Sequence, residues 1–479
     1  MFCKKTFFII LILLLTICLI VILSGRVRSE NRVFLICMDG ADWKVIDPLI
    51  EEGALPNFKK LKEEGSYGYL KSPTSFSPIE WTSIATGKKP TNHGIDSYQA
   101  DGSFVTSSDV KSKWVWELAE ESGDTVGIYN WLLAWPAEKV NGFMISLTSI
   151  NPSAEMSVYP ENLSDGVEMK NRFYNFTFQT DEVLYLFNRF VPDIFLVGDT
   201  GNRVIQGMLW KYWEPEKFNL TNQTEINMGR KILVEHYKKI DRLLNEFMSV
   251  NNSVTFLVSD HGFHEKIPSV YTIDFGFEYF FGANVCKLNV HTLSDVEYLD
   301  LCSEGKIPDK DVEFLLNITY AKSKERVFTS IKIINESRIR LSYNGTLLKY
   351  NSEPNFPSTF YLGLVVRNST VKLVFHEHSG NHDRLPIDGV IIARGDMIKN
   401  SYQIQDAVTY DITPTILYLM GIPVPEDMDG MVLVDMIKDD YMSSNPIRYS
   451  DLSSQKQRAE VDINTSEIEE KLKELGYIT

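Results

Sequence analysis

Residues 33–40 of this chain read VFLICMDG. An uninterrupted apolar run of this kind is typical of a strand that is buried on both faces, as in a parallel sheet. The run ends in Asp39, so a carboxylate follows the carboxyl end of the strand. The same arrangement returns at 193–199 (DIFLVGD) and 254–260 (VTFLVSD). We therefore expect three buried strands, each followed by an acid: Asp39, Asp199 and Asp260.

Helical patterns separate these strands. Apolar residues recur at helical spacing over 44–65, 114–122, 228–248 and 407–420, and further strands are expected at 125–129 and 389–393. Alternating strands and helices predict an α/β fold with a mostly parallel sheet flanked by helices. Ligands of such sheets bind at the carboxyl ends of the strands. A single acid there is explained by a turn or a helix cap, whereas three acids on one rim indicate a ligand site.

The α/β core is expected over 30–264 and 375–440. Between these two parts, residues 265–374 alternate β-branched and aromatic residues with polar ones, as in RVFTSIKII and RIRLSYNGTLLKY. This pattern predicts a β-rich insertion. Residues 441–479 are expected to form a polar tail with a charged amphipathic helix at 466–475.

Residues 7–23 form an almost unbroken apolar run that follows Lys4 and Lys5. The length of the run is marginal for a membrane span and also fits the core of a signal peptide. Because no A-x-A-like cleavage site follows, we expect residues 1–29 to be an uncleaved signal anchor and linker. The lysines favour a cytoplasmic N-terminus and an extracytoplasmic main domain. A cleaved signal and a secreted protein are the alternative.

The formal net charge of −16 argues against binding to nucleic acid. It does not exclude a small anionic ligand, because a bound metal can reverse the local field. Frequent N-x-S/T sequons are compatible with an exported glycoprotein. They begin at Asn162, Asn175, Asn219, Asn222, Asn251, Asn317, Asn335, Asn344, Asn368 and Asn464.

A helix of small and apolar residues is expected to begin near Ser77, in SPIEWTSIATG (77–87). Ser77 and Glu80 have the spacing of a capping box, with Pro78 at the first helical position. Two interpretations remain open at this point. Ser77 either caps the helix and does nothing else, or presents a hydroxyl where the helix N-terminus favours a phosphate or a developing oxyanion.

Asp260 and His261 directly follow a predicted strand. Adjacent carboxylate and imidazole ligands suit zinc or manganese; a capped turn with a partly buried histidine would give the same pattern. His382, in the segment SGNH, is a further candidate ligand. Together with Asp39 and Ser77, these residues describe a hydroxyl nucleophile beside a metal site. Such a metal would lower the pKa of the hydroxyl and neutralise charge on a phosphoryl group.

The chain resembles the alkaline phosphatase superfamily, and within it the type I phosphodiesterase/nucleotide pyrophosphatase branch. The matching segments are VFLICMDGAD, SPIEWTSIATGKKPTNHGI, VGIYNWLLAWPAEKVNGFMIS, VSDHG, SGNH and DITPTILYLMGIPVPEDMDG, over roughly 32–263 and 376–435. The resemblance implies an alkaline-phosphatase-like core. It also implies a metal site made by Asp39, Ser77, Asp260 and His261, with Ser77 as the nucleophile. Thr82 is a weaker alternative because it falls inside the helix.

The chain departs from the family pattern at the second metal site. That site normally has D-x-x-x-H after the strand that corresponds to DIFLV, and a later histidine that matches His382. An ungapped alignment puts Arg203 and Gly207 at the first two positions, and neither binds a divalent cation in the usual way. Unless a local shift recruits Asp199, we expect one ion instead of two. Arg203 would then supply positive charge in place of the second ion, since a guanidinium matches phosphate oxygens.

Three functions are compatible with these residues. We expect a metal-dependent phosphoric ester hydrolase that acts on a small phosphorylated substrate through Ser77. One alternative is a catalytically degenerate protein that binds a phosphorylated ligand or a glycan. The other is a transferase that moves a phospho-headgroup at the membrane surface. A sulfatase is disfavoured because the Cys/Ser-x-Pro-x-Arg motif is absent at Ser77.

Overall fold

The computed structural model describes most of the expected core and shorter parts of the remaining chain. The described residues are 31–97, 99–100, 103–146, 157–165, 178–274, 287–293, 296–302, 319–320, 328–335, 338–343, 352–353, 356–366, 369–381, 387–451 and 453–456. The expected signal anchor (1–29), His382 and the expected C-terminal helix (466–475) lie outside them. Within the described residues, no helix combines the length and the apolar character that a membrane span requires.

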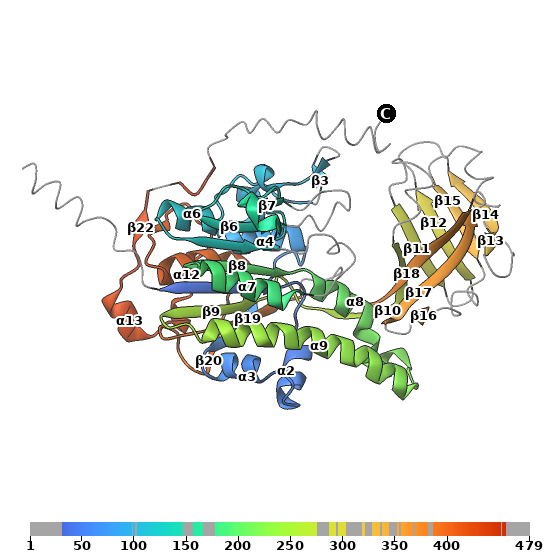
Figure 1. Ribbon diagram of the computed structural model, residues 1–479, viewed down its shortest axis with the longest axis horizontal. Coiled ribbons are helices and arrows are strands. Elements are labelled where there is room, and N and C mark those ends of the chain that lie inside the picture. The colour runs from blue at the N-terminus through green and yellow to red at the C-terminus, as the bar shows by residue number, and fades with distance from the viewer. Residues whose placement is uncertain are drawn as a thin grey trace, which may run out of the picture.

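A nine-stranded sheet forms the centre of the molecule (Figure 1). In spatial order its strands are β20 (Tyr402–Ile404), β2 (Ser66–Leu70), β19 (Gly389–Gly395), β9 (Ser253–Val258), β1 (Arg32–Met38), β8 (Ile194–Asp199), β5 (Val126–Tyr129), β6 (Gly142–Ser146) and β7 (Ser157–Tyr159). The central strands β9, β1, β8, β5 and β6 run parallel, whereas β19 and β7 are antiparallel to their neighbours within this group. The expected α/β fold with a mostly parallel sheet is confirmed.

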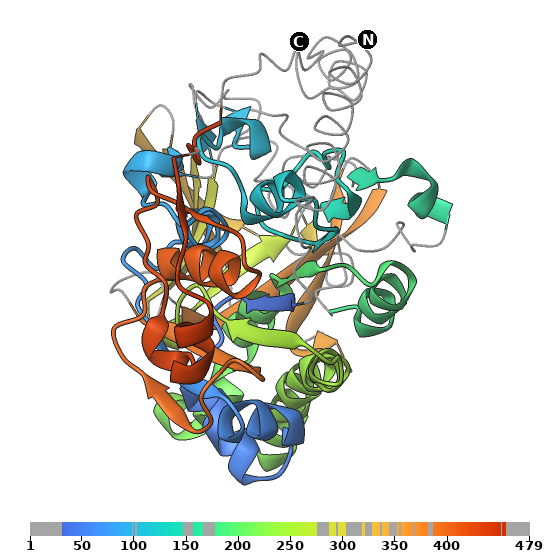
Figure 2. The ribbon, with the colours of Figure 1, turned by 90° about the vertical axis from the view of Figure 1, so that its left-hand side faces the viewer.

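Helices cover both faces of this sheet, as Figures 1 and 2 show from two sides. Successive residues of a strand point to opposite faces, so β1 contributes to two cores. One core contains Val33, Leu35 and Cys37 and is covered by α4 (Ser77–Thr86), α6 (Val115–Glu121) and α12 (Ile412–Leu419). The other contains the intervening residues of β1 and is covered by α2 (Trp43–Glu51), α3 (Pro56–Glu63), α7 (Thr180–Phe190), α8 (Gly201–Trp213) and α9 (Gln223–Met248). This double burial explains why β1 reads as a continuous apolar run.

A β-rich region lies beside the core, at the right of Figure 1. One of its sheets has the order β10-β18-β17-β13, with β16 paired to β17, and the other has the order β11-β12-β15-β14. The bounds are β10 (His264–Asp274), β11 (Lys287–Leu293), β12 (Val296–Cys302), β13 (Thr319–Tyr320), β14 (Phe328–Asn335), β15 (Arg338–Tyr343), β16 (Ser352–Glu353), β17 (Phe356–Val366) and β18 (Ser369–Asn381). These strands run from His264 to Asn381, so the region extends beyond the predicted insertion, which ends at 374. Residues 375–381, predicted to belong to the core, form the end of β18.

The chain leaves the core for the β-rich region and returns to it at neighbouring points, which we call the neck. There the Gly262 N–H donates to the Ile387 carbonyl at 2.9 Å. The Ile387 N–H in turn donates to Ser75 Oγ at 2.8 Å. The neck therefore joins the two ends of the β-rich region to the loop that precedes Ser77.

Three strands of the central sheet end on one rim. β1 pairs in parallel with both β8 and β9, and Met38 of β1 lies opposite Asp199 of β8. Asp39 and Asp260 consequently follow their strands at the same edge as Asp199. The common rim that the sequence predicts is confirmed.

Candidate active site

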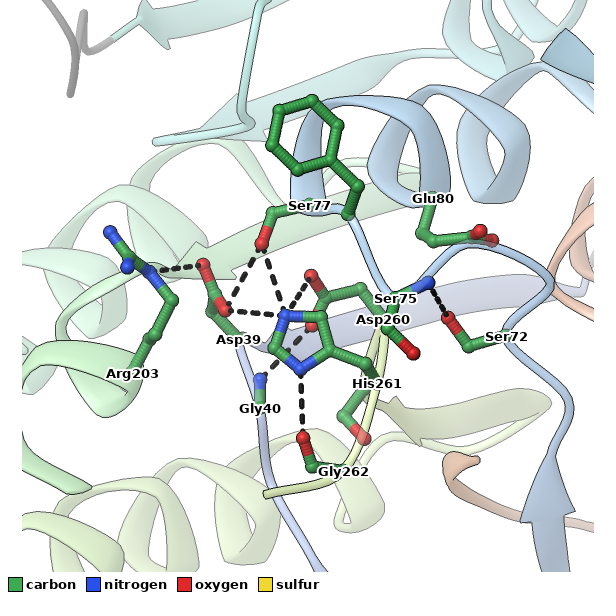
Figure 3. A network of polar contacts seen from close by, with 12 residues as sticks. Asp39, Gly40, Ser72, Ser75, Ser77, Glu80, Arg203, Asp260, His261 and Gly262 are labelled. Atoms are coloured by element: carbon green, nitrogen blue, oxygen red, sulfur yellow. Dashed lines mark hydrogen bonds and ion pairs between the residues drawn. The ribbon is translucent and has the colours of Figure 1, made fainter. Parts of the chain in front are cut away.

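Asp39, Asp260 and His261 come together on this rim (Figure 3). One ligand atom from each lies within 4.8 Å of the other two, and all three side chains are buried. The loop after β1 also touches the loop after β9 directly, because the Gly40 N–H donates to Asp260 Oδ1 at 3.0 Å. Two carboxylates and an imidazole from separate parts of the chain are thus assembled into one cluster.

Ser77 is the first residue of α4 and faces the cluster. Its Oγ lies 3.1 Å from His261 Nε2 and 3.4 Å from Asp39 Oδ1, and the side chain is buried. The structure therefore places the predicted nucleophile in contact with two of the three candidate metal ligands.

The predicted capping box at Ser77 is wrong. Phe76 is the N-cap residue, and no side chain caps the helix. Glu80 instead accepts hydrogen bonds from the Thr74 N–H at 2.8 Å and the Thr74 hydroxyl at 2.6 Å, and from the Thr409 hydroxyl at 2.6 Å. Since Ser77 is the first helical residue and not the N-cap, its hydroxyl does not cap the first turn; it lies at the rim, beside Asp39 and His261.

The start of α4 offers fewer N–H groups to an anion than the sequence suggests. The N–H groups of Ile79 and Glu80 both donate to the Phe76 carbonyl, at 2.9 and 3.1 Å, and Pro78 has none. The Ser77 N–H donates to no other group in the part of the chain that the structure describes. This amide is therefore the one of the first turn that is left for a phosphoryl oxygen.

The hydrogen bonds of His261 fix which ring nitrogen can bind a metal. His261 Nδ1 lies 2.9 Å from the Gly262 carbonyl, which can accept but not donate, so Nδ1 carries the proton. Burial lowers the pKa of His261 to about 3, and the ring is neutral at physiological pH. The lone pair of Nε2 consequently points at Ser77 Oγ and at two carboxylate oxygens, Asp39 Oδ1 at 3.4 Å and Asp260 Oδ2 at 3.2 Å.

This donor set fits a divalent cation. Burial and the neighbouring Asp260 raise the pKa of Asp39 well above its ordinary value, whereas Arg203 lowers it. Two buried carboxylates that converge on the lone pair of a nitrogen repel one another unless a cation lies between them. Two carboxylates, one imidazole and one hydroxyl suit zinc or manganese. The residues present therefore fit a metal of the kind on which the family generally depends.

Arg203 lies on α8 at the other side of Asp39 (Figure 3). Its Nε is 3.6 Å from Asp39 Oδ2, and its side chain is 43% exposed while that of Asp39 is buried. The guanidinium is thus partly exposed, and it adds positive charge beside the carboxylate. The predicted role of Arg203 toward a phosphoryl group stays a prediction.

Asp199 shares the rim but turns away from the cluster. Its Oδ2 lies 2.8 Å from Nε2 of the buried His236 on α9, and its Oδ1 accepts the Asn202 N–H at 3.3 Å. Within the described residues, Asp199 is not a member of the group that could hold a metal. The recruitment of Asp199 by a local shift therefore has no support.

The sequence patterns did not point to two further residues of α8, Asn202 and Gln206. Both are fully buried and reach the loop that carries Asp39. Asn202 Nδ2 donates to the Asp39 carbonyl at 2.9 Å, and Gln206 Nε2 donates to the Gly40 carbonyl at 2.5 Å. Their spacing of four residues puts them on one face of the helix, and that spacing was the signal available in the sequence.

The remaining candidates lie apart from the cluster. The Thr82 hydroxyl donates to the Pro78 carbonyl at 2.7 Å inside α4, which leaves this weaker alternative to Ser77 without support. Gly207 is buried in α8 and has no side chain to offer. His382 lies outside the described residues, so its predicted role as a ligand stays a prediction.

The profile of one protein family matches this chain. The family is described as type I phosphodiesterase / nucleotide pyrophosphatase, and the match spans residues 33–275. This range contains Ser77 and the whole Asp39–Asp260–His261 cluster. A comparison with curated proteins finds no match.

Solved structures also resemble the chain. Human ectonucleotide pyrophosphatase/phosphodiesterase 5 is 12% identical with a TM-score of 0.42, and the alignment covers 85% of this chain and 100% of that one. An inactive variant of the murine protein of the same name, solved in complex with AMP, is 14% identical with a TM-score of 0.42 and has the same coverage, 85% and 100%. On the evidence of the family profile, the chain belongs to the type I phosphodiesterase/nucleotide pyrophosphatase family of the alkaline phosphatase superfamily.

Proposed function

We propose that the protein is a metal-dependent phosphoric ester hydrolase that uses Ser77 as its nucleophile. Membership of the family places the chain among phosphoric ester hydrolases. The observation that carries the assignment of Ser77 is the contact of its Oγ with His261 Nε2 at 3.1 Å and with Asp39 Oδ1 at 3.4 Å. A serine that merely caps a helix turns to the N–H groups of its own first turn, and Ser77 does not.

In the proposed reaction, Ser77 Oγ attacks the phosphorus atom and gives its proton to water. An Oγ–P bond forms, the bond from phosphorus to the departing ester oxygen breaks, and that oxygen takes up a proton from water. A water molecule then hydrolyses the Ser77 phosphoryl ester and restores the hydroxyl. Asp39, Asp260 and His261 would hold one divalent ion, zinc or alternatively manganese. When bound, that ion supplies a lower pKa for the hydroxyl and neutralises phosphoryl charge.

Arg203 and the Ser77 N–H supply the remaining contacts to the phosphoryl group in this proposal. The half-exposed Arg203 side chain lies beside Asp39, where its planar fork of N–H groups can bind two phosphoryl oxygens. We propose one metal ion instead of two, because the described part of α8 presents donor groups to the Asp39 loop and no further ligands.

A small phosphorylated compound, such as a nucleotide or a phospho-headgroup, is the substrate class that we propose. We also propose that residues 1–29 anchor the protein in a membrane and that the main domain is extracytoplasmic and glycosylated. The apolar run at 7–23 and the frequent sequons support this setting. A downward shift in mass after glycosidase treatment of the membrane-associated protein would agree with it, and a protein that fractionates without membranes would point to the secreted alternative.

Hydrolysis of bis-p-nitrophenyl phosphate by the full-length protein in detergent, with zinc or manganese, tests the proposal. Ser77→Ala should lower the rate by at least about 10³-fold, because no other hydroxyl replaces the nucleophile. Ser443→Ala, on an exposed serine of α13 (Asp439–Ser444), is the matched control and should be fully active. An inactive wild-type protein with both metals would refute the hydrolase.

Two further outcomes distinguish the alternatives. Thermal stabilisation by phosphorylated ligands without turnover would identify a binding protein. Release of nitrophenol together with transfer of the phosphoryl group to an added lipid or glycan hydroxyl, instead of to water, would identify a transferase that uses the same Ser77 intermediate.

A further inference from the structure

The peptide group between Asp39 and Gly40 is held by hydrogen bonds on two sides. The carbonyl of Asp39 and the N–H of Gly40 belong to the same peptide group, which is planar. Asn202 Nδ2 donates to this carbonyl at 2.9 Å, and the N–H donates to Asp260 Oδ1 at 3.0 Å. A rotation of the peptide group would break both hydrogen bonds together. Asn202 thus sets the direction of the N–H that holds the Asp260 carboxylate.

The next peptide group is held in the same way. Gln206 Nε2 donates to the Gly40 carbonyl at 2.5 Å. Gly40 has a φ of +71°, a left-handed conformation in which the loop turns away from β1. Two amide side chains of α8, one helical turn apart, therefore fix both peptide groups that flank Gly40. The Asp39 side chain branches from the main chain immediately before the first of these peptide groups.

Tyr237 determines which way the Gln206 amide points. The Tyr237 hydroxyl donates to Gln206 Oε1 at 2.8 Å from the neighbouring helix α9, and Tyr237 is fully buried. With Oε1 bound to a hydroxyl proton, the NH₂ end of the amide faces the Gly40 carbonyl. Burial also raises the pKa of Tyr237, which keeps the hydroxyl a donor.

We propose that Asn202, Gln206 and Tyr237 are positioning residues of the metal site. Asn202 and Gln206 bind main-chain carbonyls and Tyr237 binds Gln206. All three therefore act through the main chain that presents Asp39 and, through the Gly40 N–H, Asp260. This inference rests on the metal site of the proposed function. It assigns a supporting role to α8. The amide groups of this helix donate hydrogen bonds to main-chain carbonyls, whereas a metal ligand would have to present a lone pair.

Metal affinity of the full-length protein tests this inference without any assay of activity. Competition with a chromophoric chelator gives the Kd for Zn²⁺. Gln206→Met removes the donor at nearly constant volume and should weaken binding about 10- to 100-fold, the usual effect of losing a group that orients a ligand. Tyr237→Phe should weaken it less, because the Gln206 amide loses its orientation and keeps its NH₂ group.

The double variant identifies the route of the effect. If Tyr237 acts through Gln206, Tyr237→Phe should add nothing to the loss caused by Gln206→Met. Gln223→Met is the matched control: Gln223 is exposed on α9 and donates to Asn227 at 2.9 Å, and this change should leave the Kd unaltered. Thermal unfolding of the metal-free proteins measures any purely structural effect separately.

Unchanged Zn²⁺ affinity in Gln206→Met, with the wild type binding the ion, would overturn the inference and leave the proposed function intact. A wild type that binds no divalent ion would overturn both. Weaker binding in the variants of a protein that hydrolyses no ester would support the positioning role and contradict the hydrolase. If Gln206→Met does not fold, Tyr237→Phe decides alone, and an unaltered Kd in that variant counts against the inference.

Discussion

The two sides of the Asp39 carboxylate differ in chemistry. On the α4 side it meets acceptors, namely the lone pair of His261 Nε2 and the Asp260 carboxylate, together with the Ser77 hydroxyl. On the α8 side it meets the Arg203 guanidinium, and its loop is bound by amide donors. The first side suits a cation and the second suits an anion. The helix on each side of Asp39 thus decides whether the surroundings of this carboxylate favour a cation or an anion.

The acceptor side should lose its metal when one carboxylate is neutralised. Asp260→Asn is expected to weaken Zn²⁺ binding by more than about 100-fold, since it removes a direct ligand and places an NH₂ donor beside His261. Asp199→Asn, on the same rim but bonded to His236, should leave the Kd within about threefold while costing about 1–3 kcal/mol of stability. Equal losses of affinity in both variants, measured by chelator competition, would contradict the division into two sides.

The donor side should stop supporting the metal site when both of its amides are removed. Asn202→Leu with Gln206→Met deletes the donors to the Asp39 and Gly40 carbonyls, so the loop that presents Asp39 loses its orientation. Elemental analysis of the purified protein should then fall from about one zinc ion per chain to well below one. A wild type that already holds two tightly bound ions would show that α8 does not dismantle the second site.

Arg203 should affect substrate binding more than metal binding. Arg203→Gln keeps the length of the side chain and removes its charge, so KM for a phosphodiester should rise about tenfold, with the Zn²⁺ affinity little changed. The difference should shrink at high salt, because the guanidinium is 43% exposed. Loss of metal affinity in Arg203→Gln would show that this residue supports the metal site and would contradict its assignment to substrate binding.

The smallest expected effect concerns the support of α4. Burial raises the pKa of Glu80 by more than its hydrogen bonds to Thr409 and Thr74 lower it. The folded protein therefore binds this proton more tightly than the unfolded chain does, and the stabilisation declines as the pH rises from the ordinary glutamate pKa through the raised one. Glu80→Gln should remove this dependence. Denaturant unfolding at pH 4 and pH 7 tests it, and an identical pH response of both proteins would refute it.

The sequence predicts the fold and the acceptor side because these rest on local patterns. Apolar runs that end in acids mark buried strands, and the parallel topology alone brings Asp39 and Asp260 to one rim. An adjacent histidine and a serine at a helix start complete the cluster. None of these steps requires knowledge of which side chain contacts which.

The donor side could not be predicted because it depends on contacts between distant residues. Asn202 and Gln206 read as ordinary polar residues of a helix, and an ungapped alignment drew attention to their neighbours, Arg203 and Gly207. The capping box failed for the same reason. Glu80 binds Thr74, six residues before it, and Thr409, 329 residues away along the chain. A partner as distant as Thr409 leaves no trace in local spacing.

The neck makes the β-rich region an insertion whose two ends lie next to each other. The hydrogen bond between Gly262 and Ile387 closes the core on itself, so the residues between them form a loop whose ends already meet. The entropy of closing such a loop grows only with the logarithm of its length, and close ends favour the insertion of a whole domain. Insertions and deletions among the strands between the start of β10 and the end of β18 can therefore change the size of this region while His261, one residue upstream of the neck, keeps its place.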